Sequence, residues 1–222
     1  MKILAAIPSR NNYVGLKNIL AHCLAAEHQV NKVVVYDNGY ENKSLVKELK
    51  FFDLHIDATG WPFYRMWNEA WKMSFLEGFD AVALINDDIE LPLNGLSIAS
   101  TRFEEDPSIG IIGLDYNRRV KDGLDIGPPR TVSGSARLGG IGGHAFILRS
   151  SLWGKMEPID ESYFLWYGDD ELFGNVERAG YRLEIATGIP VDHEQSTTSL
   201  KYPELMEKTS IDKEKYYSKW DY

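Results

Sequence analysis

The chain has 222 residues, 44% of them hydrophobic and 26% charged, which suits one large α/β domain or a domain with a small extension. Its formal charge of -9 provides no general basic face and argues against a long nucleic-acid backbone as partner, although a local basic patch is compatible with it. A single cysteine, Cys23, excludes an internal disulfide and a cysteine-rich zinc site.

The amino-terminal residues lead directly into an apolar run without a signal-peptide cleavage site. No apolar run approaches the length needed to span a membrane. We therefore expect a cytoplasmic protein.

The first part of the chain is predicted to form a strand, a helix and a second strand. Apolar residues fill 3–7, recur at helical spacing over 16–24 and fill 33–36. This order predicts two parallel strands joined by a right-handed crossover. The polar turn 9–12 and Asp37 would then follow the carboxyl ends of the two strands, where open α/β sheets bind ligands.

A short helix, a strand and a longer helix come next. The pattern places them at 44–50, 52–56 and 63–76. Pro62 suits the entry to the longer helix, and Gly78 suits its end.

The apolar run 81–85 has the length and composition of a strand buried on both faces, and it stops on Asn86, Asp87 and Asp88. Two adjacent carboxylates repel each other unless a cation or hydrogen bonds compensate, and a hard divalent metal is one such compensation. The alternative is a solvated turn, because Asn and Asp are common turn residues.

A helix is expected over 92–105 and a strand over 109–114. The stretch 115–143 has no regular pattern but holds four arginines, and long irregular loops in compact domains are usually functional or mobile. A strand over 145–148 follows.

The last third of the chain combines an aromatic stretch over 160–167 with an acidic helix start, which we place at Gly168 with the helix ending near Gly180. Short strands are expected at 182–185 and 190–191. We expect one domain and a helical tail packed on it, with bounds 1–202 and 203–222.

Beside Asp87 and Asp88, the sequence offers Asp169 and a late histidine, His193. A metal bound by Asp88 and His193 would have the oxygen and imidazole ligation that suits Mn²⁺ or Mg²⁺. Such a metal can hold a diphosphate as it leaves, while Asp169 accepts a proton from an incoming hydroxyl. Singly, His193 reads as an ordinary hydrogen-bonded histidine and Asp169 as a favourable helix-start acid, so the prediction depends on the whole set.

The order of these motifs resembles that of inverting glycosyltransferases with the GT-A fold, in the large family 2-like group that includes rhamnosyl and bacterial polysaccharide transferases. The resemblance covers nearly the whole chain. The stretches that carry it are Ile3-Leu-Ala-Ala-Ile-Pro-Ser-Arg-Asn11, Val33-Val-Val-Tyr-Asp-Asn-Gly39, the DxD-like Asn86-Asp-Asp88, residues 159–172, Gly180-Tyr181-Arg182, Val191-Asp-His-Glu-Gln-Ser196 and Tyr216-Tyr-Ser-Lys-Trp220. Three departures stand out: Asn86 fills the first DxD position, Gly168 replaces the Glu before the base, and Asp170 adds a second candidate base.

The resemblance implies an α/β GT-A, nucleotide-diphospho-sugar transferase fold with a mostly parallel, Rossmann-like sheet flanked by helices. It also implies metal-dependent, inverting transfer of a sugar from a nucleotide-diphosphate sugar to an acceptor hydroxyl.

By position, the resemblance assigns proton abstraction to Asp169, with Asp170 as the alternative base, and binding of Mn²⁺ or Mg²⁺ to Asp88 and His193. The expected nucleotide-sugar contacts are Pro8, Ser9, Arg10, Asp37, Asn68, Asn86 and Asp87. The expected acceptor or sugar contacts are Trp61, His144, Trp166 and Tyr167, and for the aromatic ones core packing is the alternative.

UDP is the commonest donor nucleotide in such proteins, and GDP and dTDP stay open. Polysaccharide precursors lead as acceptors, a protein or a modified nucleic acid is compatible, and the arginines of 115–143 hint at an anionic acceptor. Two other functions compete with transfer. A non-catalytic nucleotide-sugar-binding protein would bind donor without turnover, and a sugar nucleotidyltransferase would carry a Gly-rich loop where this chain has Pro8-Ser9-Arg10-Asn11.

Overall fold

The computed structural model describes residues 1–25, 30–49, 51–91, 95–116, 130–133, 141–193 and 207–220. For residues 24–25, 115–116, 130 and 187–193 it describes the backbone alone.

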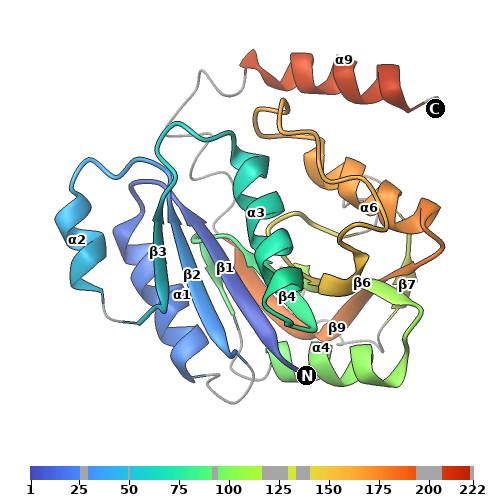
Figure 1. The fold of residues 1–222 in the computed structure, drawn as a ribbon, viewed down its shortest axis with the longest axis horizontal. Helices are drawn as coiled ribbons and strands as arrows, with labels where there is room; N and C mark the ends of the chain where they lie inside the picture. The colour runs from blue at the N-terminus through green and yellow to red at the C-terminus, as the bar shows by residue number, and fades with distance from the viewer. Residues whose placement is uncertain are drawn as a thin grey trace.

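Four parallel strands form one half of the sheet, in the order β3-β2-β1-β4 (Figure 1). Every residue of β1 and β4 is buried, as unbroken apolar runs predict for strands covered on both faces. The parallel pairing of β1 with β2 confirms the expected strand, helix and strand unit. The bounds are Ile3–Ser9 (β1), Lys32–Asp37 (β2), Leu54–Asp57 (β3) and Ala81–Ile85 (β4).

The other half of the sheet is mixed. β8 is antiparallel to β4 on one side and to β6 on the other, and β6 pairs in parallel with β9. Two short strands, β5 and β7, pair antiparallel with β9. Six of the nine strands among the described residues therefore share one direction (β1, β2, β3, β4, β6 and β9), and the predicted mostly parallel sheet is confirmed. The bounds are Ile89–Glu90 (β5), Ile109–Tyr116 (β6), Arg130–Val132 (β7), Ala145–Arg149 (β8) and Arg182–His193 (β9).

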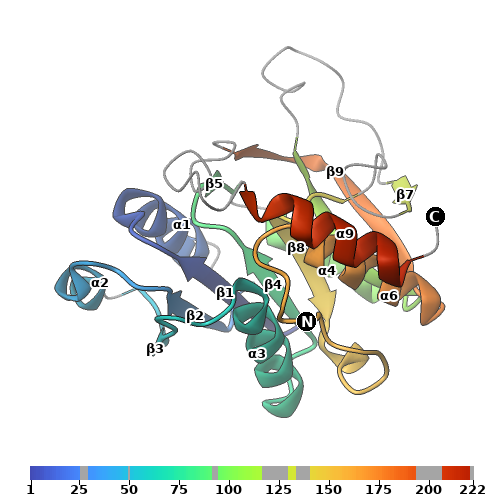
Figure 2. The same cartoon turned by 90° about the horizontal axis from the view of Figure 1, so that it is seen from above.

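Helices cover both faces of the sheet (Figure 2). Ile3, Ala5 and Ile7 of β1 share a core with α1, α2 and α4, whereas Leu4 and Ala6 share one with α3 and α6. Because successive side chains of β1 point to opposite faces of the sheet, this strand contributes to both hydrophobic cores. The helix bounds are Tyr13–Ala25 (α1), Lys43–Glu48 (α2), Phe63–Leu76 (α3), Gly95–Glu105 (α4) and Gly168–Arg178 (α6), with a 3-10 turn at Ser150–Leu152. In the part of the chain that the structure describes, no helix is both long and apolar enough to cross a membrane.

Aromatic packing joins the helices to the middle of the sheet. The ring of Phe146 on β8 meets Trp67 of α3 edge to face at 5.1 Å and Phe173 of α6 at 5.3 Å. These contacts hold α3 and α6 against the same strand, and they account for Trp67 as core packing.

Most predicted elements are observed, and two differences have clear physical causes. The two short strands expected around 182–191 are one strand, β9. The pairing of β9 with β6 continues across a register shift between Leu114 and Tyr116, where β9 has more residues than β6. β5 and β7 were not predicted, since strands of two and three residues carry no readable period.

The tail contains α9, Thr209–Lys219, which lies at the upper right of Figure 1, above α6. The domain boundary expected at residue 202 falls outside the described residues. Lys215 of α9 pairs with Asp160 at 2.7 Å. Burial raises the pKa of Asp160, but hydrogen bonds from Lys215 and Ser162 outweigh it and lower the pKa to about 2.

We predict that Lys215→Gln lowers stability by up to about 1 kcal/mol at neutral pH, as loss of a partly exposed ion pair does. Because the pKa of Asp160 is depressed in the fold, the stabilisation is complete above the ordinary carboxyl pKa of about 4 and disappears as the pH falls toward 2. Urea midpoints measured from pH 7 to 2.5 should show the difference from wild type shrinking in that window. Lys213→Gln, on the exposed part of the same helix, is the matched control. A difference that is constant down to pH 2.5 would contradict the assignment.

Candidate functional site

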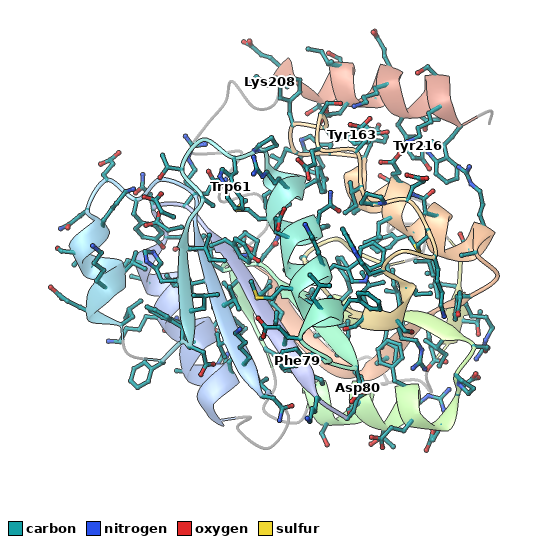
Figure 3. The ribbon with its side chains drawn as sticks, viewed as in Figure 1. Trp61, Phe79, Asp80, Tyr163, Lys208 and Tyr216 are labelled. Carbon is teal, nitrogen blue, oxygen red and sulfur yellow. The ribbon has the colours of Figure 1, made fainter. Side chains whose placement is uncertain are left out.

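The strand order gathers polar residues at one edge of the sheet. β1, β2 and β4 are parallel, so the residues that end or follow them, Ser9, Asp37 and Asn86, lie on the same edge, and Ser9 is directly paired with Asp37. β8 runs the other way and starts at this edge. The backbone N–H of Asn86 donates to the carbonyl of His144 at 2.9 Å, which extends the pairing of β4 with β8 by one residue. Figure 3 shows Trp61 near this edge and Asp80, which precedes β4, at the opposite end of the molecule.

A chain of hydroxyl groups holds Asp87 in place. Ser9 Oγ donates to Asp87 Oδ2, and Ser9 Oγ lies 2.5 Å from the Tyr40 hydroxyl. Because a serine hydroxyl has one proton and a carboxylate only accepts, Tyr40 is the donor to Ser9. Burial raises the pKa of Tyr40 to about 12, so its hydroxyl keeps its proton at neutral pH. Asp87 is 8% exposed, and this network compensates for its burial.

The backbone of Asp87 is fixed by the start of α1. The Asn12 side chain accepts from the Gly15 N–H at 3.3 Å, as the side chain of an N-cap residue does, and its Nδ2 donates to the Asp87 carbonyl at 3.1 Å. A Cβ at Gly15 would lie 2.0 Å from that carbonyl, so only glycine permits this approach. Asn11 just before has a left-handed φ of 51°, a conformation that is uncommon outside glycine and typical of functional turns.

Asp37 is fully buried and shapes the turn after β2. Its Oδ1 accepts from the N–H groups of Gly39 at 3.0 Å and Tyr40 at 2.8 Å, and its Oδ2 lies 3.3 Å from His55 Nε2. These contacts give Asp37 a structural role that does not depend on a ligand. Its predicted contact with a nucleotide base stays a prediction.

Asp169 reaches the same edge from α6. The helix starts against the turn before β8, and a Cβ at Gly143 would lie 2.4 Å from Asp169 Oδ2. Gly143 is thus the residue that admits the Asp169 carboxylate, one position before His144. Asp169 is partly exposed, whereas the alternative base, Asp170, is 6% exposed.

Tyr64 of α3 supports the start of α6. Its hydroxyl donates to the Leu165 carbonyl at 2.8 Å, and a Cβ at Gly168 would overlap its ring. The pKa of Tyr64 is raised well above its ordinary value, chiefly by burial and then by the charge of Asp169. Tyr167 lies between Leu165 and Gly168 in the chain and has a left-handed φ of 67°, a conformation that costs a bulky residue roughly 1–2 kcal/mol.

The backbone brings the two predicted metal ligands near each other. Ile89, which follows Asp88, is paired antiparallel with His193 at the end of β9. Among the residues whose side chains are described, which do not include His193, no group of three or more His, Cys, Asp or Glu could hold a metal. An Mg²⁺ site in proteins typically takes one or two carboxylates and completes its shell with water and substrate phosphate. Asp88 offers one such carboxylate at this edge, and its role as a metal ligand together with His193 stays a prediction.

Asn68 makes structural contacts that the sequence did not predict. It is 4% exposed, its Nδ2 donates to the Ile159 carbonyl at 2.8 Å, and its Oδ1 accepts from the Ile159 N–H at 3.1 Å. Both ends of the amide join α3 to the segment before α6, so we do not include Asn68 among the proposed nucleotide contacts.

The ring-bearing residues divide between the edge and the core. Trp61 is partly exposed, with the Arg65 guanidinium 4.3 Å from its ring centroid and the Tyr36 ring at 6.4 Å. Tyr167 is 8% exposed and packs on Tyr216 at 5.3 Å, so core packing accounts for it. Two further predicted contacts differ in burial: Trp166 is partly exposed, and His144 is 8% exposed.

Sequence reasoning missed Tyr40, Gly15 and Gly143 as parts of this edge. Tyr40 acts through a turn that Asp37 shapes, and the two glycines act through close backbone approach across long sequence separations. Of the three, only Gly15 had a signal in the sequence, its position three residues after a capping asparagine.

No protein-family model matches this sequence, and no curated protein matches it. Solved structures of S. aureus TarS are similar to the structure of this chain. The structure of TarS 1–349 in complex with UDP superposes with a TM-score of 0.64 at 17% identity over 96% of this chain and 65% of that one. The complex of TarS 1–349 with UDP-GlcNAc gives 0.59 at 16% identity over 96% and 66%. A longer TarS structure gives 0.67 at 14% identity over 96% and 39%.

This chain has the GT-A fold. It spans less than two thirds of the length of each of these TarS structures. At such identities the likeness establishes the fold and assigns no residue its role.

We predict that the hydroxyl chain behaves as one unit. Tyr40→Phe should lower the free energy of unfolding by about 1 kcal/mol, and Ser9→Ala by about 1–3 kcal/mol because it removes the hydroxyl that bonds both Asp87 and Tyr40. The double variant should lose less than the sum of the two. Urea denaturation checks this, with Tyr13→Phe, at the start of α1, as the control. Full additivity would show that the two hydroxyls are not coupled.

Proposed function

We propose that this protein is an inverting glycosyltransferase, which moves a sugar from a nucleotide-diphosphate sugar to an acceptor hydroxyl. The observation that carries the proposal is the placement of Asp88 and Asp169 at one edge of a GT-A sheet. Asp88 follows β4, and Asp169 enters from α6 through the space left by Gly143. The TarS complexes with UDP and UDP-GlcNAc support a UDP-sugar as donor, and GDP and dTDP sugars are the alternatives to test.

The donor side is formed by the loops after β1, β2 and β4. Arg10 is exposed at the end of β1, and a guanidinium there suits the diphosphate. Asp37 and Asp87 lie behind this surface, both buried and both hydrogen-bonded. Trp61, partly exposed at the same edge, offers a ring to a base or sugar.

Asp88 and His193 would hold Mn²⁺ or Mg²⁺, and Asp88 is favoured over Asp87 because it is the more exposed of the two carboxylates. A bound metal would offset the negative charge of the donor's diphosphate.

On the acceptor side, Asp169 accepts a hydrogen bond from the acceptor hydroxyl and takes its proton as the oxygen attacks the anomeric carbon. Attack comes from the face opposite the nucleotide, the bond between the anomeric carbon and the phosphate oxygen breaks, and the electron pair leaves with the nucleoside diphosphate. The configuration is thereby inverted, as in inverting glycosidases. Asp169 is favoured over Asp170 as base because a base must reach the acceptor, and Asp170 is 6% exposed.

We predict that Asp169→Asn retains donor binding and lowers turnover by roughly a hundredfold or more, the contribution expected of a general base. UDP binding by calorimetry and transfer to a panel of hydroxyl-bearing acceptors are the two measurements. Asp170→Asn is the matched comparison and should keep most of the turnover.

The opposite pattern would assign the base to Asp170. UDP-sugar binding by the wild type without turnover on any acceptor, with Mn²⁺ present, would instead support a non-catalytic nucleotide-sugar-binding protein.

We predict that removal of divalent metal weakens UDP binding on the order of tenfold or more, because the diphosphate loses its counter-charge. Asp88→Asn should weaken binding similarly and make it insensitive to chelator, while Glu90→Gln, an exposed carboxylate two residues further on, should behave as wild type. Calorimetry with and without chelator measures both. Equal affinities in the wild type would remove the metal role from Asp88 and His193.

A further inference from the structure

We propose that Asp212 of α9 is a positioning residue that holds the segment leading into Asp169 in its reactive geometry. The inference rests on the proposed function in one respect, the assignment of Asp169 as the base. The tail helix is thereby part of the acceptor side of the site.

Asp212 binds three consecutive backbone N–H groups. Phe164 N–H donates to Oδ1 at 3.0 Å, and the N–H groups of Leu165 and Trp166 donate to Oδ2 at 3.0 Å each. Asp212 is fully buried, so its charge depends on these donors and on its place in the first turn of α9. One carboxylate therefore fixes the backbone three to five residues before Asp169.

Two ion pairs bracket the same segment. Lys215 pairs with Asp160 at its start, and Lys219 pairs with the fully buried Glu171 at its end. Glu171 also accepts from the Asp160 N–H at 2.8 Å, so the two ends are joined. The segment 160–171 is thus closed on itself and held by α9.

Aromatic contacts complete this attachment. The ring of Tyr216 lies 5.3 Å from that of Tyr167, and Tyr217 lies 6.1 Å from Tyr167. Tyr167 is the residue with a left-handed φ, and such a backbone persists only where its surroundings enforce it. Figure 3 shows Tyr163 of this segment and Tyr216 of α9 close to each other beneath the helix.

The contact between Asp212 and the three N–H groups fixes the geometry of the loop, beyond attaching α9 to it. An apolar contact would attach a helix with less demand on geometry, whereas a buried carboxylate on three N–H groups is satisfied in one arrangement of the loop. A base misplaced by about 1 Å loses on the order of a hundredfold in rate. We therefore assign Asp212 to the placement of Asp169, and expect the donor side, built from β1, β2 and β4, to be independent of it.

The test compares Asp212→Asn with Glu214→Gln, which makes the same chemical change on an exposed position of the same helix. Hydrogen exchange should show the amides of residues 164–166 exchanging roughly tenfold or more faster in Asp212→Asn, with β1 and β4 unchanged. Turnover should fall by roughly tenfold or more, while the UDP dissociation constant and the KM for donor stay within about twofold. Glu214→Gln should match the wild type in all measurements.

Unchanged protection of residues 164–166 in Asp212→Asn would overturn the inference. So would a loss of UDP binding as large as the loss of turnover, because that pattern is general destabilisation.

Lys219→Gln is the second variant and decides the matter if Asp212→Asn does not fold. Lys219→Gln retains an N–H donor for the buried Glu171, which also keeps the Asp160 N–H, so the variant should fold while exchange near Glu171 quickens and turnover falls at constant donor affinity. No change in turnover for Lys219→Gln would count against the inference. The exchange measurement does not depend on activity. A wild type without transfer would therefore remove the proposed function, and the exchange of residues 164–166 would still decide whether Asp212 holds the segment.

Discussion

β8 runs antiparallel to both of its neighbours, and this reversal brings the two sides of the site together. Because β8 starts at the edge where β4 ends, the turn before it lies beside the loop after β4, and the Asn86 N–H bonds the His144 carbonyl. Gly143 in that turn then leaves room for the Asp169 carboxylate. If β8 were parallel to β4, its start would lie at the opposite edge, and Gly143 and His144 would not lie beside the loop after β4.

Six acidic residues at or near the site fall into two groups that burial separates. Asp37, Asp87, Glu171 and Asp212 are buried and are held by N–H, O–H or ammonium donors. Desolvation of a carboxylate is costly without such donors, so these four act as structural anchors for loops. Asp88 and Asp169 are partly exposed. In the proposed reaction they are the carboxylates that reach the ligands, and the anchors hold the loops that carry them.

Sequence patterns were sufficient for most of the elements and for the edge, because both depend on local order. The expected bounds of α3 and β4 match the structure residue by residue, since apolar period and flanking Pro and Gly define them. The contacts of Asn68 and Asp212 could not be read in this way. Asn68 binds Ile159, 91 residues away, and Asp212 binds amides 46 to 48 residues away. An asparagine that binds a nucleotide and one that binds a buried backbone look alike until the fold brings the partner into reach.

The two sides of the site differ in how they are supported, and this has consequences for the proposed reaction. The donor side is fixed near the strand ends by the hydroxyl chain through Ser9 and by the cap of α1. The acceptor side depends on α9, which reaches the segment before Asp169 from the far end of the chain. The described contacts that link the two sides include the turn before β8, at His144 and Gly143, and helix α3, whose Tyr64 and Asn68 bond the segment before α6. Sites that share few partners respond to change almost independently. In the proposed reaction, donor binding and acceptor activation should therefore respond separately to substitution, and the turn before β8, where Gly143 is required, is one place where the two sides meet.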